Sequence, residues 1–301
     1  MAIGVQLNWR RLTAWLAWVA FLAAAVSGCA WIDEQQRAKG YRPTPGTMAE
    51  WKAVSAHDEV LWLDLPAAQD GAEPQGLRAI WIAAEDPAAP AVLYLHGTFR
   101  NLYKNQPKIA AIHAAGFSVL AVDYRGWGES TRMLPSEQSI MEDAERAWVE
   151  FARRAPDPHS RVIFGHSMGS GVAVELALRH RDPLSYGALV LESGITSLPD
   201  VVRDANPLGF IAAPLVTQHF ASIEKIGSID APKWFLAGSA DKTVPARQTL
   251  ALYDAAAPPK RFELFEGGTH SGLHSEFEER YQAVWHEVAA AVRRPAVAAG
   301  P

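Results

Sequence analysis

The sequence predicts an α/β fold built on a mainly parallel sheet of eight strands, with helices on both faces. From residue 91 onward, short apolar runs alternate with longer segments whose apolar residues recur at helical spacing. Nearly continuous apolar runs are typical of strands that are buried on both faces of a parallel sheet. The six runs cover residues 91–95, 118–122, 161–164, 188–191, 233–237 and 261–265.

Two further strands are predicted before these runs, over residues 60–65 and 77–82, as an antiparallel pair that opens the sheet. Helical spacing predicts helices that include residues 138–153, 168–180, 246–256 and 272–292. Because helices directly follow strands, the crossovers are right-handed, and functional loops are expected at the carboxyl ends of the strands.

We expect one domain over residues 51–293, since the 301-residue chain shows no internal repeat and no long linker. Residues 29–50 are mixed and polar and are expected to form a tether. Residues 192–232 are expected to form a small cap over the site, and the Ala/Pro-rich residues 294–301 a loose tail.

The composition is that of a globular protein, with 49% hydrophobic and 20% charged residues. The formal net charge of -5, without a long basic run, argues against nucleic acid as a partner.

The first residues have the pattern of a secretory signal peptide, which we place at residues 1–28. Arg10 and Arg11 precede an uncharged apolar run over residues 12–26. As a helix this run reaches about 22 Å, short of the roughly 30 Å hydrocarbon core of a bilayer. A signal peptide is therefore favoured over a permanent membrane span.

The run ends in Val26-Ser27-Gly28-Cys29, which resembles the lipobox of bacterial lipoproteins. The resemblance implies cleavage before Cys29 and a lipid anchor on that cysteine, which is the only one in the chain. We expect a protein held at the bacterial cell envelope, facing the periplasm. The outer membrane is favoured because Ala30 is not the aspartate of an inner-membrane retention signal. An unlipidated secreted protein or an uncleaved anchor remain alternatives.

The pattern Gly165-His166-Ser167-Met168-Gly169 is the only G-x-S-x-G in the chain. It lies between an apolar run and a helical segment, which is typical of a sharp strand-to-helix turn that exposes a nucleophilic serine. The free N–H groups at the start of the helix favour developing negative charge. The alternative is a plain glycine-rich turn.

Five motifs in order resemble those of the α/β-hydrolase family, and the resemblance covers nearly all of residues 51–293. It is strongest to small-capped serine hydrolases of the esterase, thioesterase and peptidase-like group. The motifs are His96-Gly97-Thr98, Asp123-Tyr124-Arg125-Gly126-Trp127-Gly128, Gly165–Gly169, the segment 238–245 and Gly267-Gly268-Thr269-His270.

A serine hydroxyl needs a base within reach, and an imidazole acting as that base needs an acceptor to orient it. His270 follows the last apolar run on a glycine-rich loop and is the predicted base, with His274 as its rival. Asp241 follows the run 233–237 and is the predicted acceptor, whereas Asp230 precedes that run and lies at the opposite edge. The order Ser167, Asp241, His270 matches the family.

The tetrahedral intermediate needs two N–H donors for its oxyanion. Met168 directly follows the nucleophile and supplies one. The family's oxyanion loop, mapped on His96-Gly97-Thr98, implies the Thr98 N–H as the other and a structural role for His96. Glu192 and Ser193 end a predicted strand at the same edge and could contact the substrate.

These residues predict a serine hydrolase that cleaves carboxylic esters or thioesters through an acyl-enzyme. The apolar residues of the cap favour a small or lipid-like acyl ester as substrate. A serine aminopeptidase-type hydrolase is the alternative enzyme, and a non-catalytic lipoprotein with a binding role is a third reading. No metal or organic cofactor is expected, since no motif for either is found.

Overall fold

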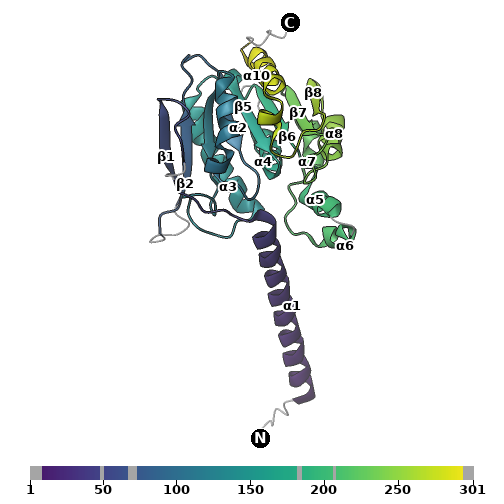
Figure 1. Ribbon diagram of the computed structural model, residues 1–301. Coiled ribbons are helices and arrows are strands. Elements are labelled where there is room, and N and C mark those ends of the chain that lie inside the picture. The colour runs from purple at the N-terminus through teal and green to yellow at the C-terminus, as the bar shows by residue number, and fades with distance from the viewer. Residues whose placement is uncertain (1–8, 48–50, 67–72, 182–184, 206–207, 294–301) are drawn as a thin grey trace, which may run out of the picture.

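The computed structural model describes residues 9–47, 51–66, 73–181, 185–205 and 208–293. Eight strands form one sheet with the order β1-β2-β4-β3-β5-β6-β7-β8 (Figure 1). β2 is antiparallel to both β1 and β4, and the other neighbouring pairs are parallel. The predicted fold class is therefore confirmed, including the antiparallel pair that opens the sheet. The strands are β1 (Asp58–Asp64), β2 (Gly76–Ile82), β3 (Ala91–Leu95), β4 (Ser118–Val122), β5 (Arg161–His166), β6 (Ala188–Glu192), β7 (Lys233–Gly238) and β8 (Lys260–Phe265).

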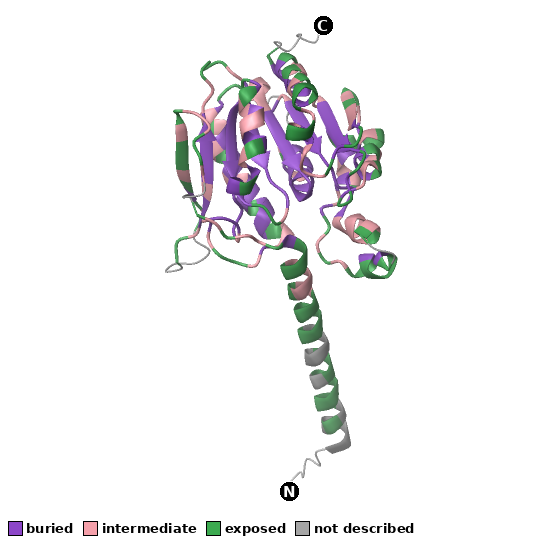
Figure 2. Ribbon diagram, in the orientation of Figure 1, coloured by how far each residue is buried: buried purple, intermediate pink, exposed green. Residues whose placement is uncertain are grey.

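Helices cover both faces of the sheet. Strands β3 to β7 are almost wholly buried (Figure 2), which explains why their sequences lack polar alternation. The helices are α1 (Trp9–Tyr41), α2 (Leu102–Ala114), α3 (Glu137–Arg154), α4 (Met168–Arg179), α5 (Leu198–Ala205), α6 (Gly209–Ala212), α7 (Ser222–Lys225), α8 (Ala246–Ala255), α9 (Leu273–Glu276) and α10 (Glu278–Val292).

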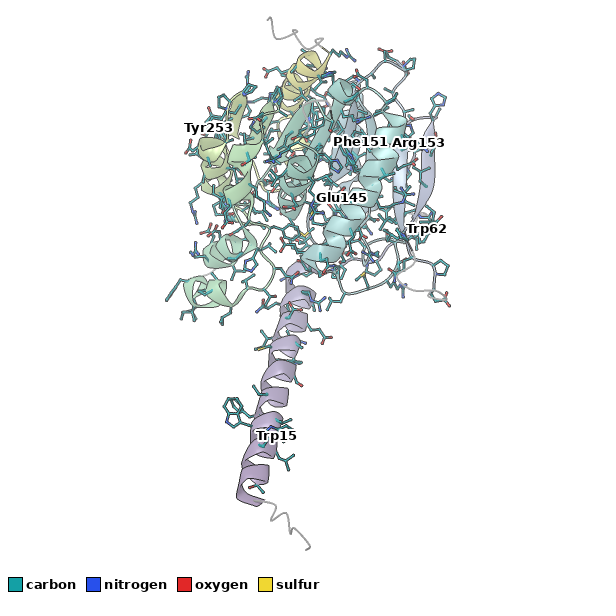
Figure 3. The ribbon with its side chains drawn as sticks, turned by 180° about the vertical axis from the view of Figure 1, so that it is seen from behind. Trp15, Trp62, Glu145, Phe151, Arg153 and Tyr253 are labelled. Carbon is teal, nitrogen blue, oxygen red and sulfur yellow. The ribbon has the colours of Figure 1, made fainter. Side chains whose placement is uncertain are left out.

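Two hydrophobic cores lie on opposite faces of the sheet. In β3, Leu93 and Leu95 belong to one core, while Val92 and Tyr94 belong to the other. The first core includes residues of α3, α4 and α8, and the second includes residues of α2, α9 and α10. Figure 3 shows the α3 side, with Phe151 on that helix.

Two helical predictions need correction. The helix predicted over 272–292 is interrupted at Phe277, where φ is -137° and ψ is 49°, so α9 and α10 are separate. The 29–50 segment, expected to be a tether, is helical as far as Tyr41 because α1 continues through it. Residues 48–50 of that segment, residues 1–8 of the proposed signal peptide and the tail 294–301 lie outside the described part of the chain.

The end of α1 is attached to the domain by polar contacts with the segment after α6. The Gln36 side chain donates to the Leu215 carbonyl at 2.7 Å, and the Tyr41 hydroxyl bonds to Gln218 at 2.9 Å. Tyr41 is also buried in the first core. The rest of α1 projects away from the sheet (Figure 1). Among the described helices, none contains a stretch that is both long and apolar enough to span a bilayer.

The segment 192–232, predicted to be a small cap, carries the short helices α5, α6 and α7. Its large apolar side chains are exposed around α6, at Leu208, Phe210, Ile211 and Leu215. α5 and α6 lie beside the end of α1 that meets the domain (Figure 1).

Candidate active site

Ser167 lies between β5 and α4 in a conformation that few non-glycine residues adopt. Its φ is 56° and its ψ is -126°, so the chain turns sharply from strand to helix at this residue. The turn also needs a residue without a side chain at 169, because a Cβ on Gly169 would lie 2.1 Å from the Leu95 carbonyl oxygen. This close approach places the start of α4 directly against the end of β3.

The three residues predicted as nucleophile, base and acceptor meet at the carboxyl edge of the sheet. The His270 Nε2 lies 3.0 Å from the Ser167 Oγ. The His270 Nδ1 lies 2.7 Å from the Asp241 Oδ2. Because a carboxylate can only accept, Nδ1 carries the imidazole proton, which leaves Nε2 free to accept the proton of the serine hydroxyl. Ser167 follows β5, Asp241 follows β7 and His270 follows β8, so three strands supply the three side chains.

Asp241 is held in its charged form. Burial alone would raise the pKa of its carboxyl group, but the hydrogen bond and charge of His270 and the backbone N–H groups of Val244 and Thr243 lower it below the ordinary value. Both N–H groups donate to Oδ1 at 2.8 Å. Oδ1 is therefore engaged by the backbone, and Oδ2 is left to orient His270.

The backbone of His270 is fixed by two side chains for which the sequence predicted no such role. His166 Nε2 lies 2.8 Å from the His270 carbonyl oxygen, and the Ser193 hydroxyl donates to the same oxygen at 3.2 Å. A carbonyl can only accept, so Nε2 of His166 carries a proton. Burial, and next the charge of Lys108, hold the pKa of His166 well below its ordinary value, so the ring is neutral.

Glu192 does not face the substrate side, as the sequence suggested it could. It is fully buried below the site, where its carboxylate pairs with the Lys108 ammonium group and accepts a hydrogen bond from the Tyr281 hydroxyl at 2.9 Å. The cluster joins α2, β6 and α10 under the loop that carries His270.

The segments that carry the two predicted oxyanion donors both adjoin Ser167. Met168 begins α4, so its N–H has no carbonyl one turn earlier to which it could donate within the helix. The loop of Thr98 approaches from β3: a Cβ on Gly97 would lie 2.9 Å from the Ser167 Cβ. His96, predicted to be structural, is buried with its Nδ1 2.6 Å from the Gly97 carbonyl oxygen, and burial lowers its pKa to about 4.

The rival candidates lie elsewhere. His274 is on α9, where its ring contacts Tyr281 at 6.3 Å between centroids, and no hydrogen bond joins it to Ser167 or Asp241 among the described residues. Asp230 precedes β7 and lies at its opposite end. Cys29 is an exposed free cysteine on α1.

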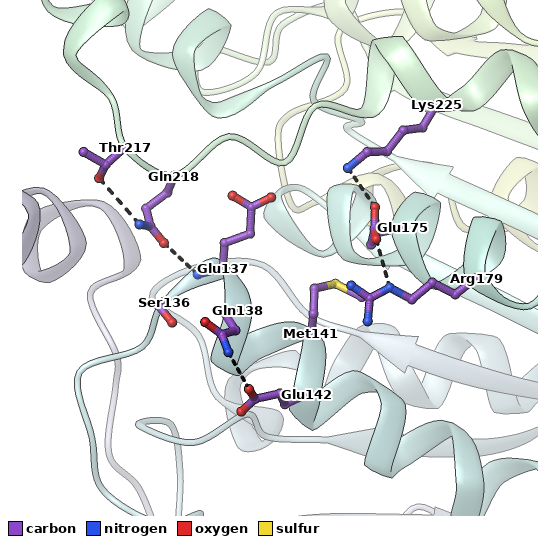
Figure 4. A pocket seen from close by; sticks show the side chains of 10 residues that line it. All are labelled: Ser136, Glu137, Gln138, Met141, Glu142, Glu175, Arg179, Thr217, Gln218 and Lys225. Atoms are coloured by element: carbon purple, nitrogen blue, oxygen red, sulfur yellow. Dashed lines mark hydrogen bonds and ion pairs between the residues drawn. The ribbon is translucent and has the colours of Figure 1, made fainter.

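A pocket of about 650 Å³ between α3, α4 and the segment 217–225 contains none of the predicted site residues (Figure 4). Its side chains are largely paired with one another: Glu175, for example, bonds to both Arg179 and Lys225. Within the described ranges, no group of three or more His, Cys, Asp or Glu side chains is arranged to hold a metal ion.

Comparison with known proteins agrees with this geometry. The family model described as serine aminopeptidase, S33, matches residues 86–225. An uncharacterized protein of Mycobacterium tuberculosis is 35% identical over 260 residues, which span 84% of this chain and 87% of that protein. The lysophosphatidylserine lipase ABHD12 of Rattus norvegicus is 31% identical over 238 residues, which span 70% of this chain and 56% of the lipase.

Solved structures show the same fold at low identity. The esterase Pf2001 of Pyrococcus furiosus superposes with a TM-score of 0.61 at 17% identity, over 81% of this chain and 96% of the esterase. The sheet order, the strand-to-helix turn at Ser167 and these matches lead to one assignment. The chain belongs to the α/β-hydrolase family of serine hydrolases.

Proposed function

We propose that this protein hydrolyses carboxylic esters or thioesters through an acyl-enzyme formed on Ser167. The observation that carries the proposal is the continuous chain of two hydrogen bonds from Ser167 through His270 to Asp241 at a strained turn. A serine held this way has its base already in place, and the base has an acceptor that fixes its tautomer.

The reaction follows from the positions of these atoms. Ser167 Oγ attacks the carbonyl carbon while its proton moves to His270 Nε2, and the new oxyanion accepts hydrogen bonds from the Met168 and Thr98 N–H groups. As the intermediate collapses, the imidazolium gives its proton to the leaving alcohol or thiol. Water then repeats the sequence on the acyl-enzyme, with His270 as base. Asp241 stabilises the imidazolium throughout.

Three findings support an ester with a lipid-like acyl chain as substrate. A relative is named a lysophosphatidylserine lipase, and an esterase shares the fold. The exposed apolar side chains around α6 also offer a surface on which an acyl chain or a lipid aggregate could rest.

We further propose that the mature protein is held at the bacterial cell envelope by a lipid on Cys29. The lipobox-like residues 26–29 support this, and Cys29 is exposed on α1. Growth with radiolabelled palmitate should label the wild type, and Cys29→Ser should abolish this label. A wild-type protein that takes up no palmitate would contradict lipidation.

A peptidase activity is the second candidate, favoured by the description of the matching family model. The two are separated by assaying p-nitrophenyl esters of increasing acyl length against aminoacyl p-nitroanilides. We expect ester cleavage that is abolished by Ser167→Ala, with little anilide cleavage. Anilide cleavage without ester cleavage would favour the peptidase.

A further inference from the structure

A second, positively charged pocket lies beside His270. It has a volume of about 380 Å³ and lies between the start of α2 and the loop that leads into α9. Its cationic lining residues are Arg100, Lys104 and Lys108, and no carboxylate is among its lining residues in the described chain. Thr269, Ser271 and Ser275 also line it; the Thr269 hydroxyl donates to Glu276 and the Ser275 hydroxyl to the Gly272 carbonyl.

This pocket is continuous with the catalytic loops through the backbone. Thr269 and Ser271 are the two neighbours of His270. On the opposite wall, the Arg100 N–H donates to the carbonyl of Thr98 at 2.8 Å, and Thr98 is the proposed oxyanion residue. The pocket is thus bounded by the segment that carries the base and by the segment that receives the oxyanion.

The cations at the mouth of the pocket are not neutralised. Arg100 and Lys104 are exposed, and neither forms an ion pair with another described residue. Lys108, deeper in, is buried and paired with Glu192. Glu276, on α9, accepts hydrogen bonds from the N–H and the hydroxyl of Thr269. Two positive charges at the mouth therefore remain available to an anion.

One lining residue, His274, carries a polar atom that has no partner in the described chain. Nδ1 of His274 is buried and has no hydrogen-bond partner among the described residues. Burial, and next the charge of Lys108, lower the pKa of this imidazole, so the ring is neutral. A neutral imidazole can donate from one nitrogen to an anionic oxygen without a charge of its own.

We propose that this pocket binds an anionic group, a phosphate or a carboxylate, on the alcohol portion of the ester substrate. The inference rests on the proposed function. In that mechanism His270 delivers its proton to the leaving oxygen, so the alcohol lies next to His270, and the pocket is lined by residues on both sides of His270. Guanidinium and ammonium donors at one site, with the Ser271 hydroxyl beside them, suit an anion with several oxygens.

The kinetic test compares monooctanoylglycerol with monooctanoylglycerol phosphate, which differ only in the anion. We expect the wild-type kcat/KM to be about 10-fold or more higher for the phosphorylated ester. Lys104→Ala should remove this preference, and Arg100→Gln should reduce it. Lys242→Ala is the matched control, since Lys242 is exposed next to Asp241 but does not line the pocket.

A binding test stands apart from activity. Calorimetric titration of Ser167→Ala with glycerol phosphate, glycerate and glycerol should show binding of one or both anions and not of glycerol. Adding Lys104→Ala should weaken this binding about 10-fold, and adding Lys242→Ala should not. Anion binding that is absent, or unaffected by Lys104→Ala, would overturn the proposal. So would equal hydrolysis of the two esters. Failure of the wild type to hydrolyse either ester would instead refute the proposed function, and the titration would still decide the pocket.

Discussion

At the scale of single residues, the position of His270 depends on contacts to its backbone as much as on its side chain. Its imidazole bridges Ser167 and Asp241, while its carbonyl accepts from His166 and Ser193. Because both the ring and the carbonyl of His270 are hydrogen-bonded, its imidazole is held next to the Ser167 hydroxyl before any substrate binds. His166, in the variable position of the G-x-S-x-G pattern, is therefore a positioning residue.

Replacing this residue tests that role. His166→Phe keeps an aromatic ring of similar size but removes the hydrogen bond to the His270 carbonyl. We expect kcat to fall about 10-fold, the equivalent of about 1.4 kcal/mol, with KM little changed. Ester hydrolysis by the two proteins provides the measurement. A rise in KM at constant kcat would show that His166 acts on substrate binding instead.

Gly169, two residues after the nucleophile, allows a test of the geometry of the turn. In Gly169→Ala the new methyl group would meet the Leu95 carbonyl oxygen at 2.1 Å and the His96 carbonyl oxygen at 2.6 Å. We expect a loss of about 3 kcal/mol in the free energy of unfolding, measured by urea denaturation. Gly40→Ala is the control, because a Cβ there has open space on α1 and should change stability by less than about 1 kcal/mol. Equal effects of the two substitutions would contradict the close approach of Gly169 to the Leu95 carbonyl oxygen.

At the scale of elements, a buried ionic cluster ties α2, β6 and α10 together under the site. Lys108 and Glu192 are both buried, and Tyr281 adds a hydrogen bond to the carboxylate. Burying such a pair costs desolvation free energy, but removing one partner costs more because the other charge stays buried and alone.

Lys108→Met should therefore lower the free energy of unfolding by about 3–5 kcal/mol, as measured by urea denaturation. The double variant Lys108→Met with Glu192→Met should recover much of this loss, since no lone charge remains. If the double variant is as unstable as the single one, the loss comes from packing rather than from an uncompensated carboxylate.

The strands were predictable because burial on both faces of the sheet gives most of them nearly continuous apolar sequences. All eight lie within two residues of the predicted positions, since continuous apolar runs have few alternatives in a chain of this kind. The helices were harder. In α2 the buried Asn105 and Lys108 interrupt the apolar face, and Pro107 lies between them, so its spacing predicts no helix. At the break, Phe277 packs against Phe265 of β8, a tertiary contact that spacing cannot show.

For the site, the motifs predicted which residues meet, because each follows an apolar run that ends at the same edge of the sheet. The support of His270 by His166 was not predictable. The hydrogen bond joins residues that are 104 positions apart, and its acceptor is a backbone carbonyl, which every residue has. The burial of Glu192 was equally hidden, because its partner Lys108 lies in the helix that the spacing does not predict.

In the whole molecule, the catalytic residues and a second buried cation, Lys233, lie at opposite edges of the sheet. Lys233 begins β7 and is buried, with its Nζ donating to the carbonyls of Ile229 at 2.6 Å and Ala231 at 2.7 Å. Burial lowers its pKa to about 8. The unfolded chain therefore binds this proton more tightly than the folded protein.

This difference predicts a pH dependence of stability. Below pH 8 Lys233 is protonated in both states, and its burial lowers the free energy of unfolding by the full amount. Between pH 8 and about pH 10.5 the folded protein has lost this proton, and the loss of stability disappears as the unfolded chain loses it too. The free energy of unfolding of the wild type, relative to Lys233→Met, should rise by about 2 kcal/mol between pH 7 and pH 10. Urea denaturation of both proteins across this range is the measurement. A constant difference would show that Lys233 keeps its ordinary pKa in the fold.

The proposed hydrolysis depends on Ser167 as the nucleophile and on His270 as the base that activates it. The most direct measurement is labelling of the purified protein with a fluorophosphonate probe, followed by digestion and mass spectrometry of the modified peptide. We expect a single adduct on Ser167, no labelling of Ser167→Ala, and labelling of His270→Ala that is slower by a factor of about 1,000 or more. An adduct on another residue, or labelling of Ser167→Ala at the wild-type rate, would contradict this expectation.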